Sequence, residues 1–300
     1  MKAKTKAFVF VDVLLLLMTT LPILTALVIK VLFSPASEGI SITGALVYFE
    51  IPMPLQNLPI SEAQVNSALV LIAVFGLCLY ITHGIRAGVQ TRRQVLAEWA
   101  VEKLNGMVTE SMGDFFAGYA PFIAAILLLS AFSSLSSLFG IFPPTSDLNI
   151  VLGWAILVFV LITYYKLKGG VGNYLKGYLE PIPVMLPLNI LGEVATPVSM
   201  AFRHYGNVLS GSVIAVLIAA ALQGASGLVL GWIPLLGEIP LLRVGLPAVL
   251  SVYFDVFSGC MQAYIFAMLT MLNISGGFPQ DEFEKRRLKK LAKKEALKIK

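Results

Sequence analysis

One arginine, Arg203, lies deep inside an apolar stretch of the sequence, among small and polar residues. A charged side chain near the middle of a membrane costs at least about 2.5 kcal/mol, so a retained one usually faces a cavity or a partner. The guanidinium keeps its proton at any workable pH. The position of this fixed charge therefore indicates an ion pathway, or an anionic group facing the helix.

Polar and small residues recur around Arg203 at intervals of three and four, which puts them on one face of a helix. The members of this face are Ser199, Arg203, Gly206, Asn207, Ser210 and Gly211. A later apolar segment carries Ser251, Asp255, Ser258, Gly259 and Gln262. If the two helices are antiparallel, Gln262 lies near the level of Arg203. Asp255 then lies toward the outer surface, near Ser212.

Several of these polar residues also allow a purely structural interpretation. Serines and amides can join membrane helices through small-residue contacts and hydrogen bonds. His204 could fill a packing gap, and Glu193 is a weaker candidate for the pathway than Arg203. A lone buried carboxylate such as Asp255 is expected to be either neutralised or functional.

The composition requires a bilayer as solvent. Of the 300 residues 57% are hydrophobic, and the mean hydropathy is +0.84, so a soluble domain would lack the polar surface to cover itself. Runs long enough to cross a core of about 30 Å occur near 7–33, 67–85, 118–141, 148–165, 183–222 and 240–275. We predict an all-α polytopic membrane protein with about six membrane helices. The last two are long and tilted, and they pack as an antiparallel hairpin.

Basic residues are distributed so that both termini are expected in the cytoplasm, where short loops rich in Lys and Arg remain. They precede the first run and follow the second and fourth, whereas loops 34–66 and 142–147 contain acidic residues but no Lys or Arg. Between the second and third runs, apolar residues at helical spacing among charges predict a helix on the cytoplasmic surface. Its apolar positions are Leu96, Trp99, Ala100, Leu104, Met107 and Val108.

Three regions divide the chain. Residues 1–34 form an N-terminal span, for which a cleaved signal peptide is the alternative and length favours retention. Residues 61–276 form one membrane domain. Residues 279–300 form a basic tail: the stretch 281–300 alone has nine basic and four acidic residues. Such a tail is expected near anionic headgroups, and nucleic-acid binding is the weaker interpretation.

Several chemistries are not supported by the sequence. It has no glycine-rich phosphate loop and no zinc-spaced His or Cys cluster, so nucleotide chemistry would belong to partners. Cys78 and Cys260 lie inside apolar runs, where we expect no disulfide, and we expect no metal or cofactor. Ser–Lys, paired Asp or metal-binding His groups at helical spacing, which an intramembrane enzyme would need, are absent as well.

Two signatures resemble those of subunit a of the F-type ATP synthase. Pro-Val-Ser-Met-Ala-Phe-Arg-His-Tyr-Gly-Asn, 197–207, is similar to that family's Pro-x-Ser-x-x-x-Arg-x-Phe-Gly-Asn pattern, and Gln-Ala-Tyr-Ile-Phe-Ala-Met-Leu-Thr, 262–270, resembles its last-helix signature. Pro-Thr-Ser-Asp-Leu-Asn, 144–149, and the Gly-Glu pair at 192–193 agree in order and spacing. The resemblance covers roughly residues 61–275.

The resemblance implies an ion-translocating, non-catalytic stator subunit of the F0 sector in a bacterial cell membrane. Its partners would be a ring of c subunits, the b-subunit peripheral stalk and the remaining synthase subunits. Two half-channels would reach the ring from opposite sides, and the ion would most often be a proton. The implied pathway residues are Arg203 as the essential rotor-facing charge, with Asn207, Gln262, Asp255, Ser212, Glu193 and His204.

This sequence departs from the family pattern at three positions. The family often has Glu or His where this chain has Ser212, and His204 and Tyr205 replace the commoner Leu and Phe. A stand-alone secondary transporter or channel is the alternative, because it too could place Arg203 opposite an anionic substrate at mid-membrane. That class usually has repeated halves, which the sequence does not show.

Overall fold

The computed structural model describes residues 6–33, 44–54, 56–85, 91–179, 182–230, 249–250, 252–281, 283–285 and 288. In this part of the chain six helical stretches are long and apolar enough to cross a membrane, which confirms the predicted polytopic all-α class. They are α1 (Lys6–Phe33), α2 (Glu62–Thr82), α4 (Ala120–Leu135) with flanking turns η1 (Asp114–Tyr119) and η2 (Ser136–Phe139), α5 (Leu148–Lys168), α7 (Leu186–Leu230) after turn η4 (Pro183–Met185), and α9 (Gly259–Gly276) preceded by η5 (Val252–Ser258). Most of the basic tail and Ser251 lie outside the described residues.

Shorter elements connect these spans. Helix α3 (Arg92–Met112) fills the predicted surface-helix position, η3 (Pro144–Ser146) precedes α5, and α6 (Val171–Leu179) follows it. Strands β1 (Val47–Ile51) and β2 (Leu58–Ser61) pair antiparallel. This small hairpin and α6 were not expected from the sequence.

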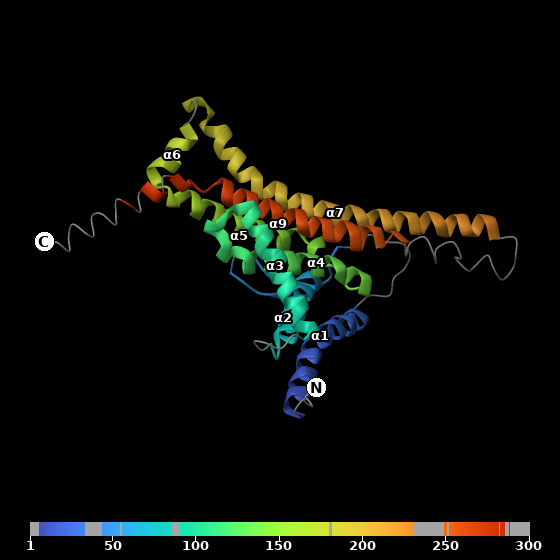
Figure 1. Cartoon of the computed structure of the whole chain (residues 1–300). Helices are drawn as coiled ribbons and strands as arrows, with labels where there is room; N and C mark the ends of the chain where they lie inside the picture. Colours follow the sequence, from blue (N-terminus) through green and yellow to red (C-terminus); the bar gives the residue numbers. More distant parts are fainter. Residues whose placement is uncertain are drawn as a thin grey trace.

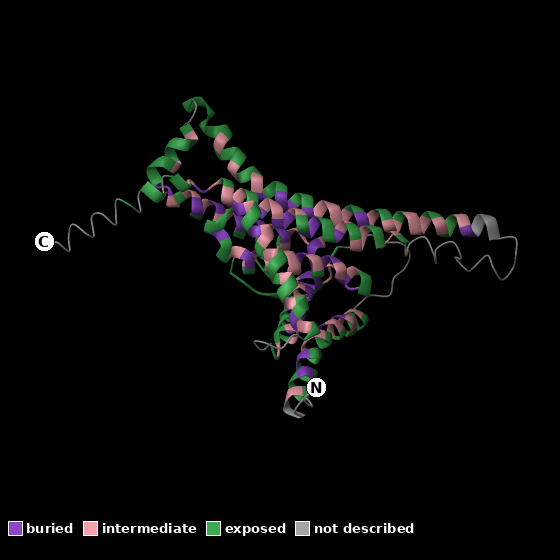
Figure 2. Cartoon of the chain, in the orientation of Figure 1, coloured by how far each residue is buried: buried purple, intermediate pink, exposed green. Residues whose placement is uncertain are grey.

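The apolar core lies where α3, α4, α5 and α9 meet, and Figure 2 shows the buried residues concentrated in the middle of the bundle. Phe266 and Met271 of α9 pack there with Ile123 of α4, and all three are almost fully buried. The core thus fixes α9 against α4 and α5, which holds the polar residues of α9 at a defined level.

Helix α7 is far longer than a membrane is thick. Its 45 residues correspond to about 68 Å at 1.5 Å per residue, against a hydrocarbon core of about 30 Å. Figure 1 shows its C-terminal part extending past the rest of the bundle, with α9 alongside its middle. Much of α7 is therefore covered by nothing within the described part of the chain.

One end of the bundle, here called the basic end, collects the ends of helices that carry Lys and Arg. Arg93 of α3 forms a two-pronged ion pair with Asp12 of α1 at 2.8 and 3.1 Å. His83, just after α2, lies 3.0 Å from the same carboxylate. Further along, Phe115 of η1 stacks on Phe278 after α9 at 4.5 Å. Asp12 is buried, and Arg93 and His83 provide the hydrogen-bonding partners that its carboxylate would otherwise find in water.

The opposite end, here called the acidic end, holds the β hairpin and the loop before α5. Asn66 of α2 donates a hydrogen bond to the Phe142 carbonyl at 2.9 Å, and Ser61 donates to Asp147 at 3.5 Å. Lys30, at the far end of α1, donates to the Gly140 carbonyl. The charge bias in the sequence thus corresponds to two separate ends of one bundle.

Candidate ion pathway along α7

Arg203 lies on the exposed side of α7, while the next residue, His204, is fully buried. Successive residues are about 100° apart around a helix, so one can be exposed while the next is buried. The ion pairs between described residues join Asp12 to Arg93 and His83, and Lys166 to Glu193. Arg203 takes part in none of these ion pairs between described residues.

Contacts between α7 and the last span show that the two run in opposite directions. Asn273 donates to the Met200 sulfur at 3.5 Å, Ser258 donates to Asn207 Oδ1 at 2.8 Å, and Gly211 lies against Phe254. Residues that come later in α7 therefore contact residues that come earlier in η5 and α9, as in an antiparallel pair. Arg203 is one turn before Asn207 in α7, and Gln262 is one turn after Ser258 in the last span. The antiparallel order therefore places Gln262, which is buried, at the same level as Arg203.

Asp255 lies in η5, a seven-residue π-helix on the acidic-end side of that contact. Its side chain is partly buried. Ser212, on the corresponding part of α7, is exposed and donates to its own helix at the Leu209 carbonyl, 2.8 Å away. π-Helical turns occur frequently at functional sites, but periodicity in a sequence does not reveal them.

His204 is enclosed on the inner side of α7. Its Nε2 lies 3.3 Å from Ser130 Oγ of α4, and its ring meets Trp154 of α5 and Phe266 of α9 edge-on. Nδ1 is buried and has no hydrogen-bond partner among the described residues. The packing-gap interpretation accounts for the ring contacts but not for this nitrogen.

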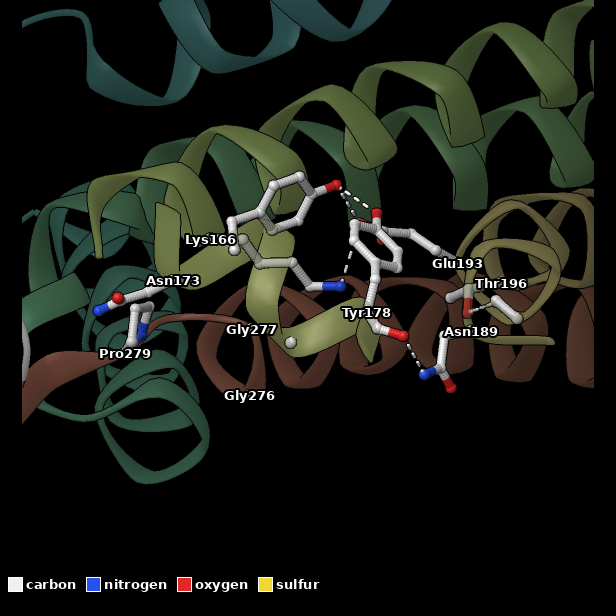
Figure 3. Close-up of a pocket in the computed structure, with 12 residues that line it drawn as sticks. Lys166, Asn173, Tyr178, Asn189, Glu193, Thr196, Gly276, Gly277 and Pro279 are labelled. Carbon is white, nitrogen blue, oxygen red and sulfur yellow. Dashed lines mark hydrogen bonds and ion pairs between the residues drawn. The ribbon is translucent and has the colours of Figure 1, made fainter. Parts of the chain in front are cut away.

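Glu193 is the centre of a polar cluster near the basic end. Its Oε1 accepts hydrogen bonds from Lys166 Nζ and Tyr174 OH, each at 3.1 Å, and its Oε2 accepts one from Tyr178 OH. The two phenol oxygens lie 2.5 Å apart. Figure 3 shows Lys166 of α5, Tyr178 of α6 and Glu193 of α7 pointing toward one another. Burial, followed by the bond to Glu193, raises the pKa of Tyr178 above its ordinary value.

Two adjoining cavities meet at this cluster. One of about 520 Å³ is lined by α6, the start of α7 and Gly276–Gly277. A second, of about 240 Å³, extends along the cluster to Asn273 and Thr196. Thr196 precedes Arg203 by seven residues, which is about 10 Å along a helix. The cavities thus run from the basic end toward the arginine.

Sequence reasoning missed Lys166, Tyr174, Tyr178 and Ser130 as members of the site. The spacing of four between the two tyrosines could have indicated one helical face. Lys166 directly follows the fourth apolar run, where a basic residue indicates the orientation of the span and not a partner for Glu193. No group of three or more His, Cys, Asp or Glu within the described ranges is placed to hold a metal, and Cys78 and Cys260 are both free thiols.

The fold and this site define a multi-pass membrane protein. In the described part of the chain, an exposed arginine without an ion-pair partner lies on a long helix, between polar groups at either end. The chain matches the ATP synthase A chain family over residues 65–275, and it belongs to that family. It is 32% identical to ATP synthase subunit a of Acidothermus cellulolyticus over 222 residues, covering 70% of this chain and 74% of that one.

Two other relatives bear on the ion. ATP synthase subunit a of Bacillus subtilis is 30% identical over 233 residues, covering 73% of this chain and 91% of that protein. A protein of Propionigenium modestum named as the sodium-ion-specific subunit a is 31% identical over 212 residues, covering 65% and 66%. Similarity of this degree therefore does not by itself choose between proton and sodium.

Proposed function

We propose that this chain is the ion-translocating stator subunit of the F0 sector in a bacterial plasma membrane, and that the ion is the proton. Its partners are a ring of c subunits, the b-subunit peripheral stalk and the other synthase subunits. The observation that carries the proposal is the exposed Arg203, which lacks a described ion-pair partner within its own chain. A retained charge at mid-membrane needs an anionic group, and here that group comes from outside.

Two half-channels lead to this arginine. The inner one begins at the basic end, in the cavities around Glu193 and Thr196. The outer one approaches from the acidic end, past Asp255, Ser212 and Asn207. Because the basic end holds the Lys- and Arg-rich loops, it faces the cytoplasm, and both termini lie on that side.

Arg203 separates the half-channels electrostatically. A ring carboxylate that passes the arginine is held ionised by the fixed positive charge, so it releases its proton into one channel. It is reprotonated from the other channel before it enters lipid. A bare proton is repelled by the guanidinium, which suppresses leakage. Gln262 and Asn207 line the path next to the arginine.

The chain itself performs no covalent chemistry. An ion gradient supplies about 2.3 kcal/mol per charge for each 100 mV, so several ions must cross for each ATP formed on partner subunits. Ion flow past α7 turns the ring, and ATP synthesis takes place elsewhere in the complex.

ATP-driven acidification of inverted membrane vesicles tests the proposal. Arg203→Ala is expected to abolish pumping while a blot shows an assembled complex. Arg92→Ala is the matched control, because Arg92 is also exposed but lies at the start of α3; it should pump as the native chain does. Pumping by assembled Arg203→Ala complexes, or purification of an active chain without ring or stalk proteins, would contradict the proposal.

A further inference from the structure

We propose that a cavity between α1, α2 and α4 binds one acyl chain of an anionic phospholipid, whose phosphate group is held by Lys30 at the cavity mouth. The cavity has a volume of about 260 Å³ and lies near the acidic end of the bundle. It is separate from the α7 residues of the proposed function. The inference requires only that the chain spans a bilayer.

A proline in α1 explains why the cavity exists. Before this proline α1 lies close to α2, since a Cβ at Gly76 would be 3.1 Å from Met18. Pro22 lies inside the helix and lacks the amide hydrogen that would bond to the Met18 carbonyl, and such prolines kink a helix. Figure 1 shows α1 changing direction along its length. Pro22 and Ala26, one turn apart, both line the cavity, so the two helices enclose a space here.

The cavity interior is apolar although two polar residues line it. Asn66 donates to the Phe142 carbonyl at 2.9 Å, and Ser136 donates to the Ser133 carbonyl at 2.7 Å. Every other lining side chain is aliphatic or aromatic. A buried water needs about two to four polar partners, and cavities without them stay dry and bind apolar ligands. The interior therefore suits a hydrocarbon chain.

One side of the cavity is closed by protein and another side is open. On the closed side Ala26 and Ala73 are 4% and 9% exposed, whereas Leu138 and Phe139 at the rim are 45% and 57% exposed. An acyl chain can therefore enter sideways from the bilayer between apolar side chains.

A partner helix is too large to fill this space. A helix with its side chains is about 10 Å or more across and rises about 5.4 Å per turn. One turn thus occupies about 400 Å³, more than the whole cavity. A single hydrocarbon chain is slender enough to enter, so a lipid is the occupant that fits.

Lys30 supplies the charge that selects an anionic lipid. It lies one turn after Ala26 on α1, and residues four apart share a helix face. Its Nζ donates to the Gly140 carbonyl, and the residues on either side of Gly140, Phe139 and Ile141, line the cavity. An ammonium has three donors, so two remain. Among the residues that the structure describes, no carboxylate forms an ion pair with Lys30. A lipid phosphate can accept these charge-assisted hydrogen bonds.

The test uses the complete synthase in phosphatidylcholine bilayers that contain a small fraction of a photoreactive lipid. This lipid carries its reactive group midway along one acyl chain and is either phosphatidylglycerol, which is anionic, or phosphatidylcholine, which has no net charge. After irradiation, labelled peptides of this chain are quantified by mass spectrometry. The cavity peptides, which contain Ala73 or Phe139, are compared with a reference peptide of α5 that contains the exposed Ile156 and Val160.

Four variants accompany the native chain. Lys30→Gln removes the charge at the mouth, and Lys30→Arg keeps it. Ala73→Phe fills the cavity with a large side chain. Ala68→Phe is its matched control, because Ala68 is an exposed residue of α2 that does not line the cavity.

We expect phosphatidylglycerol to label the native cavity peptides about fivefold more than phosphatidylcholine, since one basic side chain near a membrane surface contributes about 1 kcal/mol to binding of anionic lipid. The reference peptide should show no such preference. Lys30→Gln should abolish the preference, and Lys30→Arg should retain it. Ala73→Phe should lower labelling of the cavity peptides by both lipids, while Ala68→Phe leaves it native.

Equal labelling of the native cavity peptides by the two lipids overturns the proposal, because ordinary bulk lipid then fills the groove. Unlabelled cavity peptides beside a labelled reference peptide overturn it too, since a partner protein then covers the cavity. Native labelling in assembled Ala73→Phe complexes has the same meaning. The comparison of the two lipids on the native complex decides the question even if no variant assembles.

Discussion

Neutralising Glu193 with Glu193→Gln tests whether its carboxylate holds α6 against α7. The carboxylate is the shared acceptor for Lys166 of α5 and for Tyr174 and Tyr178 of α6. An amide of the same shape retains one acceptor oxygen and removes the charge. We expect α6 to separate from α7 more often and the cavity between them to open.

The magnitude follows from the three hydrogen bonds that Glu193 accepts. Hydrogen bonds to charged groups contribute about 1.5–3 kcal/mol each and neutral ones about 0.5–1.5. Lys166 is 31% exposed, so it turns to water at little cost and its bond adds little to the difference. The two tyrosines remain, with about 1 kcal/mol lost at each. A total of about 2 kcal/mol corresponds to about thirtyfold in the population of the open state.

Cysteine accessibility measures this opening. Thr196 lines both cavities, so Thr196→Cys, in a chain whose Cys78 and Cys260 are replaced by Ala, reports on access from the cytoplasmic face. With a membrane-impermeant thiol reagent applied to inverted vesicles, we expect labelling to be faster in Glu193→Gln by up to about thirtyfold. Glu110→Gln is the control, since Glu110 is an exposed residue of α3.

An unchanged labelling rate in assembled Glu193→Gln complexes would refute the reasoning, because the carboxylate would then not be what closes the cavity. Equal acceleration by the Glu110 control would refute it too, since a general loss of negative charge at the basic end would explain the effect.

Three more predictions concern packing, an ion pair and pH. Gly259→Val should lower the melting temperature of the detergent-solubilised complex, because a Cβ at this position would lie 2.8 Å from Ser134 Cβ. Such overpacking costs about 1–3 kcal/mol. A melting temperature equal to that of the native complex would contradict the close contact. Asp12→Asn should release the first span and expose it to protease, because Arg93 loses its two-pronged partner. In the native chain the hydrogen bonds to Asp12 hold the pKa of Arg93 above its ordinary value. An unchanged rate of proteolysis would show that apolar contacts alone hold the first span in place. The pKa of Tyr178 is raised in the folded chain, so its contribution to stability is complete below about pH 10 and is lost as pH rises through the folded value. Alkaline unfolding that is identical in Tyr178→Phe would contradict this.

The spans could be predicted because apolar length is a property of the sequence alone. Each of the six runs contains a described helix, and several boundaries shift by a few residues: the second helix begins at Glu62. The larger differences are in the last two: α7 continues to Leu230, and the last long helical stretch begins at Val252, because most of residues 240–251 lie outside the described part of the chain. The β hairpin was missed because its strands have only five and four residues, and one contains a proline. Helix α6 was missed because its nine residues include two glycines and a lysine and lie outside the apolar runs.

The sequence predicted the polar face of α7 in the candidate site, but not the contacts that side chains of α7 make with other helices. Helical periodicity gave the shared face of Arg203 and Asn207, and the structure pairs Asn207 with Ser258 as an antiparallel arrangement requires. Periodicity describes one helix at a time, so it could not name the partners of Glu193, which come from two other helices. It also could not show that His204 faces inward while its neighbour faces out. The roles of these residues stay predictions until the variants are measured.

The π-helix η5 has a consequence for how the last span tolerates changes of length. An i→i+5 helix holds about one more residue per turn than an α-helix, so the seven residues of η5 turn through roughly the angle of six α-helical residues. Deleting one residue at 256–258 would therefore let an ordinary α-helix form while Asp255 and Gln262 keep a similar angular relation. A single deletion inside α9, between Gly259 and Gln262, would instead rotate the two residues by about 100° relative to each other.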